Sequence, residues 1–394
     1  MLKDSVVIVS SARTPLGNLL GELKDFPGHE LGAHVIQAVV QRANLKTTDV
    51  HEIIMGCVLP AGQGQAPARQ AAIQAGIPNS TPCTTINKVC GSGMKAVMLI
   101  HDMLLCGTTD VAIAGGMESM TNAPYLLLKA RQGYRLGQSE LYDHMVLDGL
   151  EDAYDKGRPM GYFAEQCVKK YGFTRKQQDE YAISSFERAQ YAIRDKAFEA
   201  EIAPLTLQTK QGEQIIDTDE HPFSVNYEKI PKLLPIFSKE GTVTAGNSSS
   251  ISDGAAAVVL MTLSESKKRC ITPLANIVGH MSYAKSPAEF TTAPVEATRK
   301  LMEKLQWTVD DVDLFEVNEA FAVVALVFMH ALKIPREKVN IHGGACALGH
   351  PIGASGTRII VTLLAALQQN NLKRGIATLC IGGGEATAIA IEIL

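Results

Sequence analysis

The chain has 394 residues, of which 46% are hydrophobic and 20% are charged, and its 37 basic and 41 acidic residues give a formal net charge of −4. A chain of this length exceeds the size at which one hydrophobic core stops growing, so we expect two or three domains. The balanced charge excludes a basic surface for nucleic acid or anionic membranes. The longest apolar run, residues 320–329, is half of the ~20 residues that a membrane span needs.

The eight cysteines are spread along the chain, and none forms a Cys-x-x-Cys pair. Such dispersed cysteines indicate reduced thiols rather than a disulfide framework or a zinc site. A strand-like run begins at Val6, which leaves no room for a targeting peptide before it. We therefore expect a cytoplasmic protein without a metal site that binds neither nucleic acid nor membranes.

Strand-like and helical runs alternate in the first 120 residues. After the opening strand, apolar side chains at helical spacing predict an amphipathic helix over residues 31–44, and a second strand-like run follows at residues 49–55. This alternation is typical of an α/β fold with a mostly parallel sheet.

A cysteine lies among small residues at Cys90-Gly91-Ser92-Gly93, directly before an apolar stretch that predicts a buried helix. A helix N-terminus places unpaired N–H groups and the positive end of the helix dipole beside the sulfur, and both favour the nucleophilic thiolate. The glycines let a substrate approach the backbone. Because an isolated cysteine is more often inert packing, the nucleophile interpretation depends on partners elsewhere in the chain.

The composition changes between residues 121 and 245, where charged helices, such as one predicted over residues 174–195, alternate with proline-containing loops. We interpret this segment as an inserted loop domain. The apolar segment 251–261 returns to strand character. The predicted domains are therefore residues 1–120 with 246–270, the inserted residues 121–245, and residues 271–394.

Three landmarks of the first half recur in the same order in the second half. Residues 49–55 resemble residues 311–317 at an offset of 262, and residues 91–93 resemble residues 354–356 at an offset of 263. A strand-like run that leads through glycines to Glu118 matches one that leads to Glu385, at an offset of 267. Chance similarity of short apolar motifs is the alternative, but the common order predicts a duplicated α/β unit.

Polar residues follow a predicted strand of the second half at Asn318-Glu319. The carboxyl end of a strand is where open α/β sheets place ligand sites. The alternative is that one of these residues only caps the next helix. Further on, His350 lies in a segment with five glycines, residues 343–356, which leaves its imidazole available for proton transfer near neutral pH.

A second cysteine of interest, Cys380, ends a strand-like run before Gly382-Gly383-Gly384. Backbone N–H groups exposed by these glycines can bind a developing oxyanion. A nucleotide-binding glycine loop is the rival interpretation, but the chain contains neither GxGxxG nor GxxxxGK.

With Cys90, Asn318, His350 and Cys380 in one chain, the sequence resembles the thiolase family, and within it the acetyl-CoA acetyltransferases. The resemblance runs from Ser11-Ala12-Arg13-Thr14-Pro15 to the glycines after Cys380. It implies an α/β fold of two similar βαβαβαββ halves with mixed, mostly parallel sheets. It also implies that the inserted loop domain carries coenzyme A contacts and oligomer contacts.

The resemblance also implies the role of each catalytic residue. Cys90 is the acyl-accepting nucleophile, His350 is the base that activates it, and Cys380 is the acid/base that acts on the methyl group of the incoming acetyl-CoA. Asn318 holds a water that forms one oxyanion hole with His350. The backbone N–H groups of Cys90 and Gly382 form the other.

For coenzyme A, the resemblance points to the segment 242–249 and to apolar walls around the pantetheine. The implied substrate-binding residues are Ser249, Ala245, Leu150, Met160, Phe237 and Phe321. Three positions depart from the family pattern. Pro159 replaces a common histidine, Phe223 replaces a basic residue used against a coenzyme A phosphate, and Ala386 replaces the last glycine of the terminal motif.

The activity implied is the reversible Claisen condensation of two acetyl-CoA to acetoacetyl-CoA and coenzyme A, by a ping-pong mechanism through an acyl-cysteine. We expect no cofactor, and we expect the chains to assemble as a homotetramer. The nearest alternative is a degradative 3-ketoacyl-CoA thiolase with the same catalytic residues. Met160 favours short acyl groups, because a bulky side chain beside the acyl pocket blocks a longer chain.

Two alternatives from other classes conflict with the catalytic residues. A non-catalytic lipid carrier or scaffold would have lost Cys90, His350 or Cys380, and all three are present. A malonyl-using ketosynthase resembles a Cys-His-His pattern, whereas this chain has Cys380 in place of a second active histidine.

Overall fold

The first half of the chain folds as the predicted alternation of strands and helices. The computed structural model describes residues 4–210 and 212–394. The main elements of this half are β1 (Val6–Arg13), α1 (Gly28–Arg42), β3 (Glu52–Gly56), α2 (Pro67–Gln74), β4 (Cys83–Ile86), α3 (Ser92–Leu105), β5 (Val111–Ser119) and β10 (Ser252–Thr262). They follow the expected βαβαβαββ order. Shorter elements are β2 (Gly17–Asn18), a 3₁₀ helix (Thr47–Asp49) and α7 (Leu263–Lys268).

The second half repeats this order except at its third strand. Its elements are β11 (Ala275–Ala284), a 3₁₀ helix (Pro287–Thr292), α8 (Ala293–Leu305), β12 (Leu314–Val317), α9 (Ala322–Leu332), a 3₁₀ helix (Arg336–Lys338), α10 (Ala345–Leu348), α11 (Ser355–Gln369), β13 (Arg374–Ile381) and β14 (Glu385–Ile393). Where the first half has β4, this half keeps only a parallel bridge from Phe315 to Val339.

The side chain of Asn340 explains the missing strand. Its Oδ1 accepts a hydrogen bond from the Val317 N–H at 2.7 Å, and its Nδ2 donates to the Val317 carbonyl at 2.8 Å. One amide side chain therefore makes the hydrogen bonds that a continued strand would have made beside β12, and the expected βαβαβαββ order is wrong at this element.

The strands form one mixed sheet in the order β12-β13-β14-β11-β1-β10-β5-β3-β4. Pairing is parallel at both ends, and the pairs through the middle are antiparallel. The mixed sheet is confirmed, but mostly parallel pairing holds only for the outer strands. Three residues connect β13 to β14, and so short a turn joins only antiparallel neighbours. In the first half, residues 120–251 stand in place of that turn.

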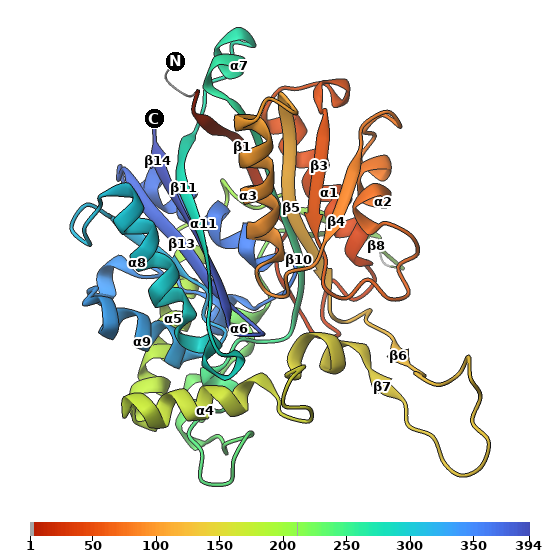
Figure 1. The fold of residues 1–394 in the computed structure, drawn as a ribbon, viewed down its shortest axis with the longest axis vertical. Helices are drawn as coiled ribbons and strands as arrows, with labels where there is room; N and C mark the ends of the chain where they lie inside the picture. The colour runs from red at the N-terminus through yellow and green to blue at the C-terminus, as the bar shows by residue number, and fades with distance from the viewer. Residues whose placement is uncertain (1–3, 211) are drawn as a thin grey trace.

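Alternate residues of each strand face different hydrophobic cores, as the two-residue period of a strand requires. Val7 and Val9 face a core shared with α1 and α2, whereas Val6 and Ile8 face a central core shared with α3 and α11. A third core packs the second half against α8 and α9. Helices α3 and α11 therefore lie between the two halves, as Figure 1 shows.

Glycines let α3 and α11 cross at close range. A Cβ atom at Gly93 would lie 2.7 Å from Thr357 Oγ1, and one at Gly356 would meet the backbone nitrogen of Met94. The repeat offset of 263 relates Gly93 to Gly356 and Met94 to Thr357. It therefore converts the contact between Gly93 and Thr357 into the contact between Gly356 and Met94. The two halves are therefore related by an approximate two-fold axis at this crossing, and the predicted duplication is confirmed.

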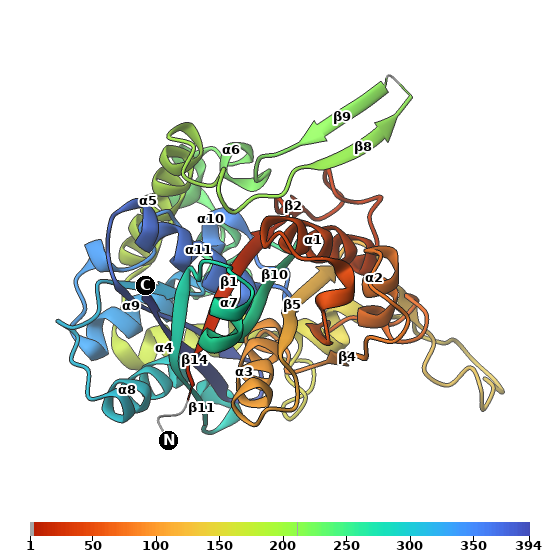
Figure 2. The same ribbon diagram turned by 90° about the horizontal axis from the view of Figure 1, so that it is seen from above.

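The predicted insertion contains two hairpins and two longer helices. Its elements are β6 (Tyr125–Leu126), β7 (Tyr142–Asp143), a π-helical turn (Val146–Leu150), α4 (Met160–Tyr171), α5 (Arg175–Arg194), β8 (Leu205–Thr209), β9 (Gly212–Ile216), α6 (His221–Ser224) and 3₁₀ helices Tyr227–Lys232 and Ala245–Asn247. The loop between β6 and β7 projects far from the body in Figure 1, and the β8–β9 hairpin projects in Figure 2. The boundaries 121 and 245 remain a prediction.

No helix within the described residues combines the length and the apolar character that crossing a bilayer requires.

Candidate active site

Cys90, His350 and Cys380 line one cavity of about 60 Å³, together with Gly382. The residues come from the start of α3, the loop before α11, and the end of β13 with its following turn. The rest of the lining is Val89, Gly149, Leu150, Met160, Ser249, Phe290, Ala320, Phe321 and Ile352. The structure therefore brings eight of the predicted site residues to one place.

Cys90 precedes Gly91, the N-cap residue of α3, and follows a strained residue. Val89 has a φ of 47°, a left-handed conformation that β-branched residues rarely adopt. Side chains hold it there. Asn87 Oδ1 accepts from the Val89 N–H at 2.9 Å, and Ser92 Oγ donates to the Val89 carbonyl at 2.6 Å. Strain of this kind persists where the surroundings fix it, and here it positions Cys90 at the cavity.

Burial raises the pKa of Cys90 to about 11, although the backbone N–H groups of Gly382 and of Cys90 itself lower it and the Glu118 carboxylate raises it slightly. Burial therefore opposes the thiolate that the helix N-terminus favours. Loss of hydration favours the neutral thiol, so Cys90 needs a base to remove its proton.

His350 is held as a neutral imidazole. Ser355 Oγ donates to the Pro351 carbonyl at 2.9 Å, so the same oxygen accepts from His350 Nδ1, 2.6 Å away. This hydrogen-bond network assigns the proton to Nδ1 and leaves Nε2 as the base. Burial lowers the pKa of His350 to about 3, with a smaller contribution from the Arg358 charge.

Asn318 lies behind His350 and does not line the cavity. Its Nδ2 is 3.4 Å from His350 Nε2, and its buried Oδ1 has no hydrogen-bond partner among the described residues. The helix-cap alternative is wrong, because α9 begins at Ala322 and its N-cap, Phe321, makes no side-chain hydrogen bond. The Asn318 amide is therefore available to the site.

Glu319 has a different task from its neighbour. Its buried carboxylate accepts hydrogen bonds from Tyr181, Ser185 and Asn340, each at 2.7 Å, and from the Cys346 N–H at 3.1 Å. These partners lie on α5, on the segment after α9 and on α10. Glu319 therefore joins the inserted region to the loop that leads to His350.

Cys380 is fully buried at the end of β13, and burial holds its pKa well above the usual value, with the nearby Cys90 adding to the effect. The turn that follows requires glycine. Gly383 and Gly384 have φ values of 87° and 88°, and a Cβ at Gly384 would meet the Lys285 carbonyl. Ala386 lies beyond the turn, paired with Cys380 in the sheet, where its methyl group is buried without conflict.

The predicted coenzyme A segment, residues 242–249, is held by hydrogen bonds to its backbone. Glu165 accepts from the backbone N–H groups of Thr242 and Val243 at 2.7 Å each. The Ser249 N–H and Oγ both donate to the Ala320 carbonyl, at 3.0 and 3.1 Å. Ser249 therefore reaches the cavity in a fixed position.

Two of the predicted coenzyme A-binding residues do not line the cavity. Phe237 packs against Phe321, with ring centroids 6.1 Å apart, and so lies one layer behind the wall. Ala245 is exposed on the 3₁₀ helix Ala245–Asn247.

Glu118 was missed as a site residue. Its buried carboxylate accepts from the backbone N–H groups of Val58 at 2.9 Å, Leu59 at 3.1 Å and Gly353 at 2.9 Å. Burial raises its pKa to about 7. It fixes the loop beside His350 to the first half. The repeated landmark that ends at Glu118 was the available signal, since a carboxylate at the end of a buried strand needs partners.

Alkylation of Cys90 by iodoacetamide is expected to accelerate about tenfold per pH unit between about pH 6 and pH 9, because the thiolate fraction of a thiol with pKa about 11 keeps rising over that range. Peptide mass mapping at short times gives the rate, with the exposed Cys106 as the internal reference thiol. A plateau below pH 8 would reveal a resting thiolate–imidazolium pair and contradict this description.

Comparison with known proteins gives matches over nearly the whole chain. The model described as "Thiolase, N-terminal domain" matches residues 6–264, and "Thiolase, C-terminal domain" matches residues 271–393. An acetyl-CoA acetyltransferase of Cupriavidus necator is 46% identical over 389 residues, covering 98% of this chain and 99% of that protein. Acetyl-CoA acetyltransferase 2 of Arabidopsis thaliana is 49% identical over 393 residues, covering 99% and 97%.

Solved structures agree in fold. The acetyl-CoA acetyltransferase of Bacillus anthracis superposes with a TM-score of 0.97 at 39% identity, covering 100% of this chain and 99% of the other. The Acat5 thiolase of Ascaris suum in complex with coenzyme A gives a TM-score of 0.94 at 39% identity, covering 99% and 100%.

Proposed function

The chain belongs to the thiolase family, and on that basis we propose that it is an acetyl-CoA acetyltransferase, which condenses two acetyl-CoA to acetoacetyl-CoA and coenzyme A and also catalyses the reverse thiolysis. The observation that carries the proposal is the meeting of Cys90, His350 and Cys380 in one cavity. Full-length relatives of similar sequence bear the same name as the proposed activity.

In the first half-reaction, the Cys90 sulfur attacks the thioester carbonyl of acetyl-CoA while its proton passes to His350 Nε2. The neutral imidazole and the thiol suit this transfer, because neither is charged before substrate arrives. The tetrahedral intermediate then breaks its bond to the coenzyme A sulfur. Cys380, a thiol at rest, donates its proton to that leaving thiolate and becomes a thiolate itself.

In the second half-reaction, a second acetyl-CoA enters and the Cys380 thiolate removes a proton from its methyl group. The resulting enolate attacks the acetyl carbon on Cys90, forming the carbon–carbon bond of acetoacetyl-CoA. The Cys90 thiolate leaves and recovers its proton from the His350 imidazolium. All three residues return to their starting state, so the cycle consumes nothing except the coenzyme A thioesters.

Two groups of donors support the negative charges that develop on the oxygens. The backbone N–H groups of Cys90 and Gly382 face the Cys90 sulfur, and we propose that they receive the oxyanion of the tetrahedral intermediate. For the enolate oxygen we propose His350 with a water held by the unpartnered Asn318 Oδ1. A buried acceptor without a partner is where an ordered water is expected.

We propose that coenzyme A enters along the inserted residues 121–245 and the segment 242–249. Ser249, Leu150, Met160 and Phe321 line the cavity and would flank the end of the pantetheine. Position 223 holds a phenylalanine in place of the basic residue that the family uses against a coenzyme A phosphate. However, the Arg194 guanidinium lies 5.8 Å from the centre of the Phe223 ring and supplies a positive charge there from α5.

Thiolysis rates with acetoacetyl-CoA, 3-ketohexanoyl-CoA and 3-ketooctanoyl-CoA, measured on one preparation, test the proposed chain length. We expect acetoacetyl-CoA to be preferred, because Met160 lines the cavity together with Gly382, and a bulky side chain beside the acyl pocket blocks a longer chain. Met160→Ala is expected to raise kcat/KM for the six-carbon substrate relative to acetoacetyl-CoA about tenfold, the scale of one or two methylenes in a pocket.

The matched control is Met103→Ala, which shortens a half-buried methionine of α3 outside the cavity and should leave the ratio unchanged. Equal rates for all three substrates with the unmodified chain would instead favour the degradative 3-ketoacyl-CoA thiolase.

We also propose a homotetramer in a reducing compartment such as the cytoplasm. The projecting loop between β6 and β7 exposes Leu128, Leu136 and Leu141, and large apolar side chains left exposed on an extended loop are typical of a contact between copies. Light scattering at micromolar concentration should give the mass of four chains, and a monomeric mass would refute the assembly.

All eight cysteines are free thiols, as the proposed chemistry of Cys90 and Cys380 requires.

A further inference from the structure

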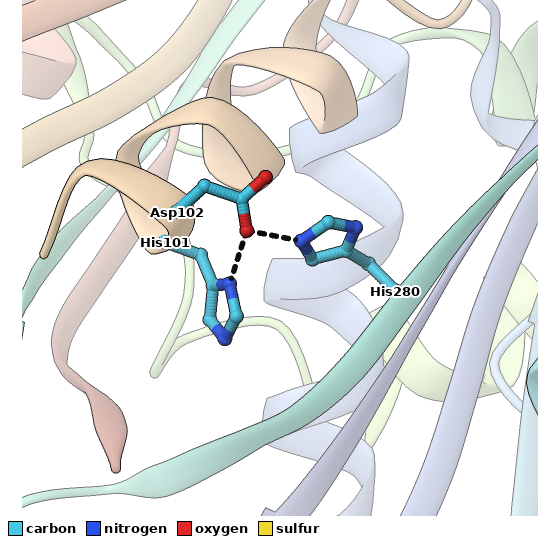
Figure 3. Close-up of side chains that lie close together, drawn as sticks. All are labelled: His101, Asp102 and His280. Carbon is cyan, nitrogen blue, oxygen red and sulfur yellow. Dashed lines mark hydrogen bonds and ion pairs between the residues drawn. The ribbon is translucent and has the colours of Figure 1, made fainter. Parts of the chain in front are cut away.

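A second cluster of reactive side chains lies at the opposite end of α3 from Cys90. His101 and Asp102 are in the last turns of α3, and His280 is on β11 of the other half. Figure 3 shows both imidazole rings directed at one carboxylate oxygen. From this arrangement we propose that His101, Asp102 and His280 form a binding site for Zn²⁺ or a similar divalent transition metal ion, at the seam between the two halves.

The distances are those of a site that is nearly assembled. Asp102 Oδ1 is 3.0 Å from His101 Nδ1 and 2.9 Å from His280 Nε2, and the three ligand atoms all lie within 4.8 Å of one another. An ion with bonds of 2.0–2.1 Å holds neighbouring ligand atoms about 3–3.5 Å apart. Two of the three separations are already close to that length, so small shifts of the two imidazole rings would direct all three ligand atoms at one ion.

The surroundings favour a cation. His101 is largely buried, and its Nδ1 faces the Asp102 carboxylate. Asp4 and Asp102 line the hollow of about 350 Å³ in which the cluster lies, and Lys304 is the one cation there among the described residues. Among the described residues, the carboxylates that line the hollow therefore outnumber its cations by two to one.

The donor set also selects the class of ion. Two imidazoles and one carboxylate suit zinc and other first-row transition ions, whereas Mg²⁺ and Ca²⁺ prefer oxygen ligands only. About half of the Asp102 side chain is exposed, so solvent can reach the site and complete the coordination shell with water. Bound there, the ion would tie α3 of the first half to β11 of the second.

The test is Zn²⁺ binding to the full-length protein after removal of metals with a chelator. Calorimetry should show one Zn²⁺ per chain, and a rise in Tm with free Zn²⁺ should follow. His280→Gln and Asp102→Asn should each weaken binding at least tenfold. Asp102 is largely exposed, so Asp102→Asn is expected to fold even where His280→Gln does not.

The matched control is His51→Gln, because His51 is another histidine beside an aspartate, 3.7 Å from Asp110, but belongs to no cluster. It should bind Zn²⁺ like the unmodified chain. Co²⁺ serves as the spectroscopic probe. Visible bands without a sulfur-to-cobalt charge-transfer band support the site, whereas such a band would place the ion on a cysteine and overturn the proposal.

Absence of binding, or binding that survives both Asp102→Asn and His280→Gln, would also overturn it and leave the cluster a hydrogen-bonded one. The proposal does not depend on the acyltransferase activity, since every readout is of metal binding.

Discussion

Replacing Cys90 by serine is expected to lower condensation and thiolysis by about 10⁴-fold or more, the scale on which losing a nucleophile acts. The hydroxyl keeps the shape of the thiol, but it is a far weaker acid, so the same imidazole produces far less of the nucleophilic anion from it. Incubation with acetyl-CoA followed by peptide mass mapping should show acetyl on Cys90 of the unmodified chain and almost none on the serine variant.

The matched control is Cys106→Ser, which changes an exposed thiol just after α3 and should retain full activity. Acetyl found on another residue while Cys90 stays free would falsify the nucleophile assignment.

Replacing Cys380 by serine should separate the two half-reactions. Acetyl transfer to Cys90 is expected to persist at a reduced rate, because His350 still accepts the Cys90 proton and the coenzyme A thiolate can leave without the proton that Cys380 donates. Condensation and thiolysis should fall by about 10²-fold or more, the usual loss with a general acid/base. A hydroxyl at this buried position cannot become the anion that removes a methyl proton. Acyl-enzyme mass and steady-state rates, measured on the same preparation, distinguish the two effects.

Cys167→Ser is the control for burial, because it makes the same change at another buried cysteine outside the cavity. Near-native thiolysis by a folded Cys380→Ser variant would reduce Cys380 to a packing residue. The second half of the proposed mechanism would then be wrong.

Local signals in the sequence were sufficient where one segment decides the outcome. The helix after Cys90, the strand before Asn318 and the glycine turn after Cys380 each depend on short-range spacing, and the structure has all three. The duplication was also visible, because its landmarks recur at nearly one offset.

Features that depend on distant contacts were not predictable. The strand beside β12 is missing because the Asn340 side chain satisfies Val317, a pairing that no local pattern encodes. The pKa of Cys90 followed burial rather than the helix start, and burial is decided by the loops that close over it. The role of Glu118 depends on its hydrogen bond with the Gly353 N–H, which comes from the other half of the chain.

The crossing of α3 and α11 at Gly93 and Gly356 has a consequence for stoichiometry. The same offset of 263 that relates these glycines relates Cys90 to Gly353, and His350 to Asn87. A Cβ atom at Gly353 would lie 2.6 Å from the Glu118 carboxylate. Gly353, the counterpart of Cys90 in the second half, therefore has no room for a nucleophilic side chain. A duplicated chain that could have carried two reaction centres thus carries one, and each chain should take up a single acetyl equivalent at saturation.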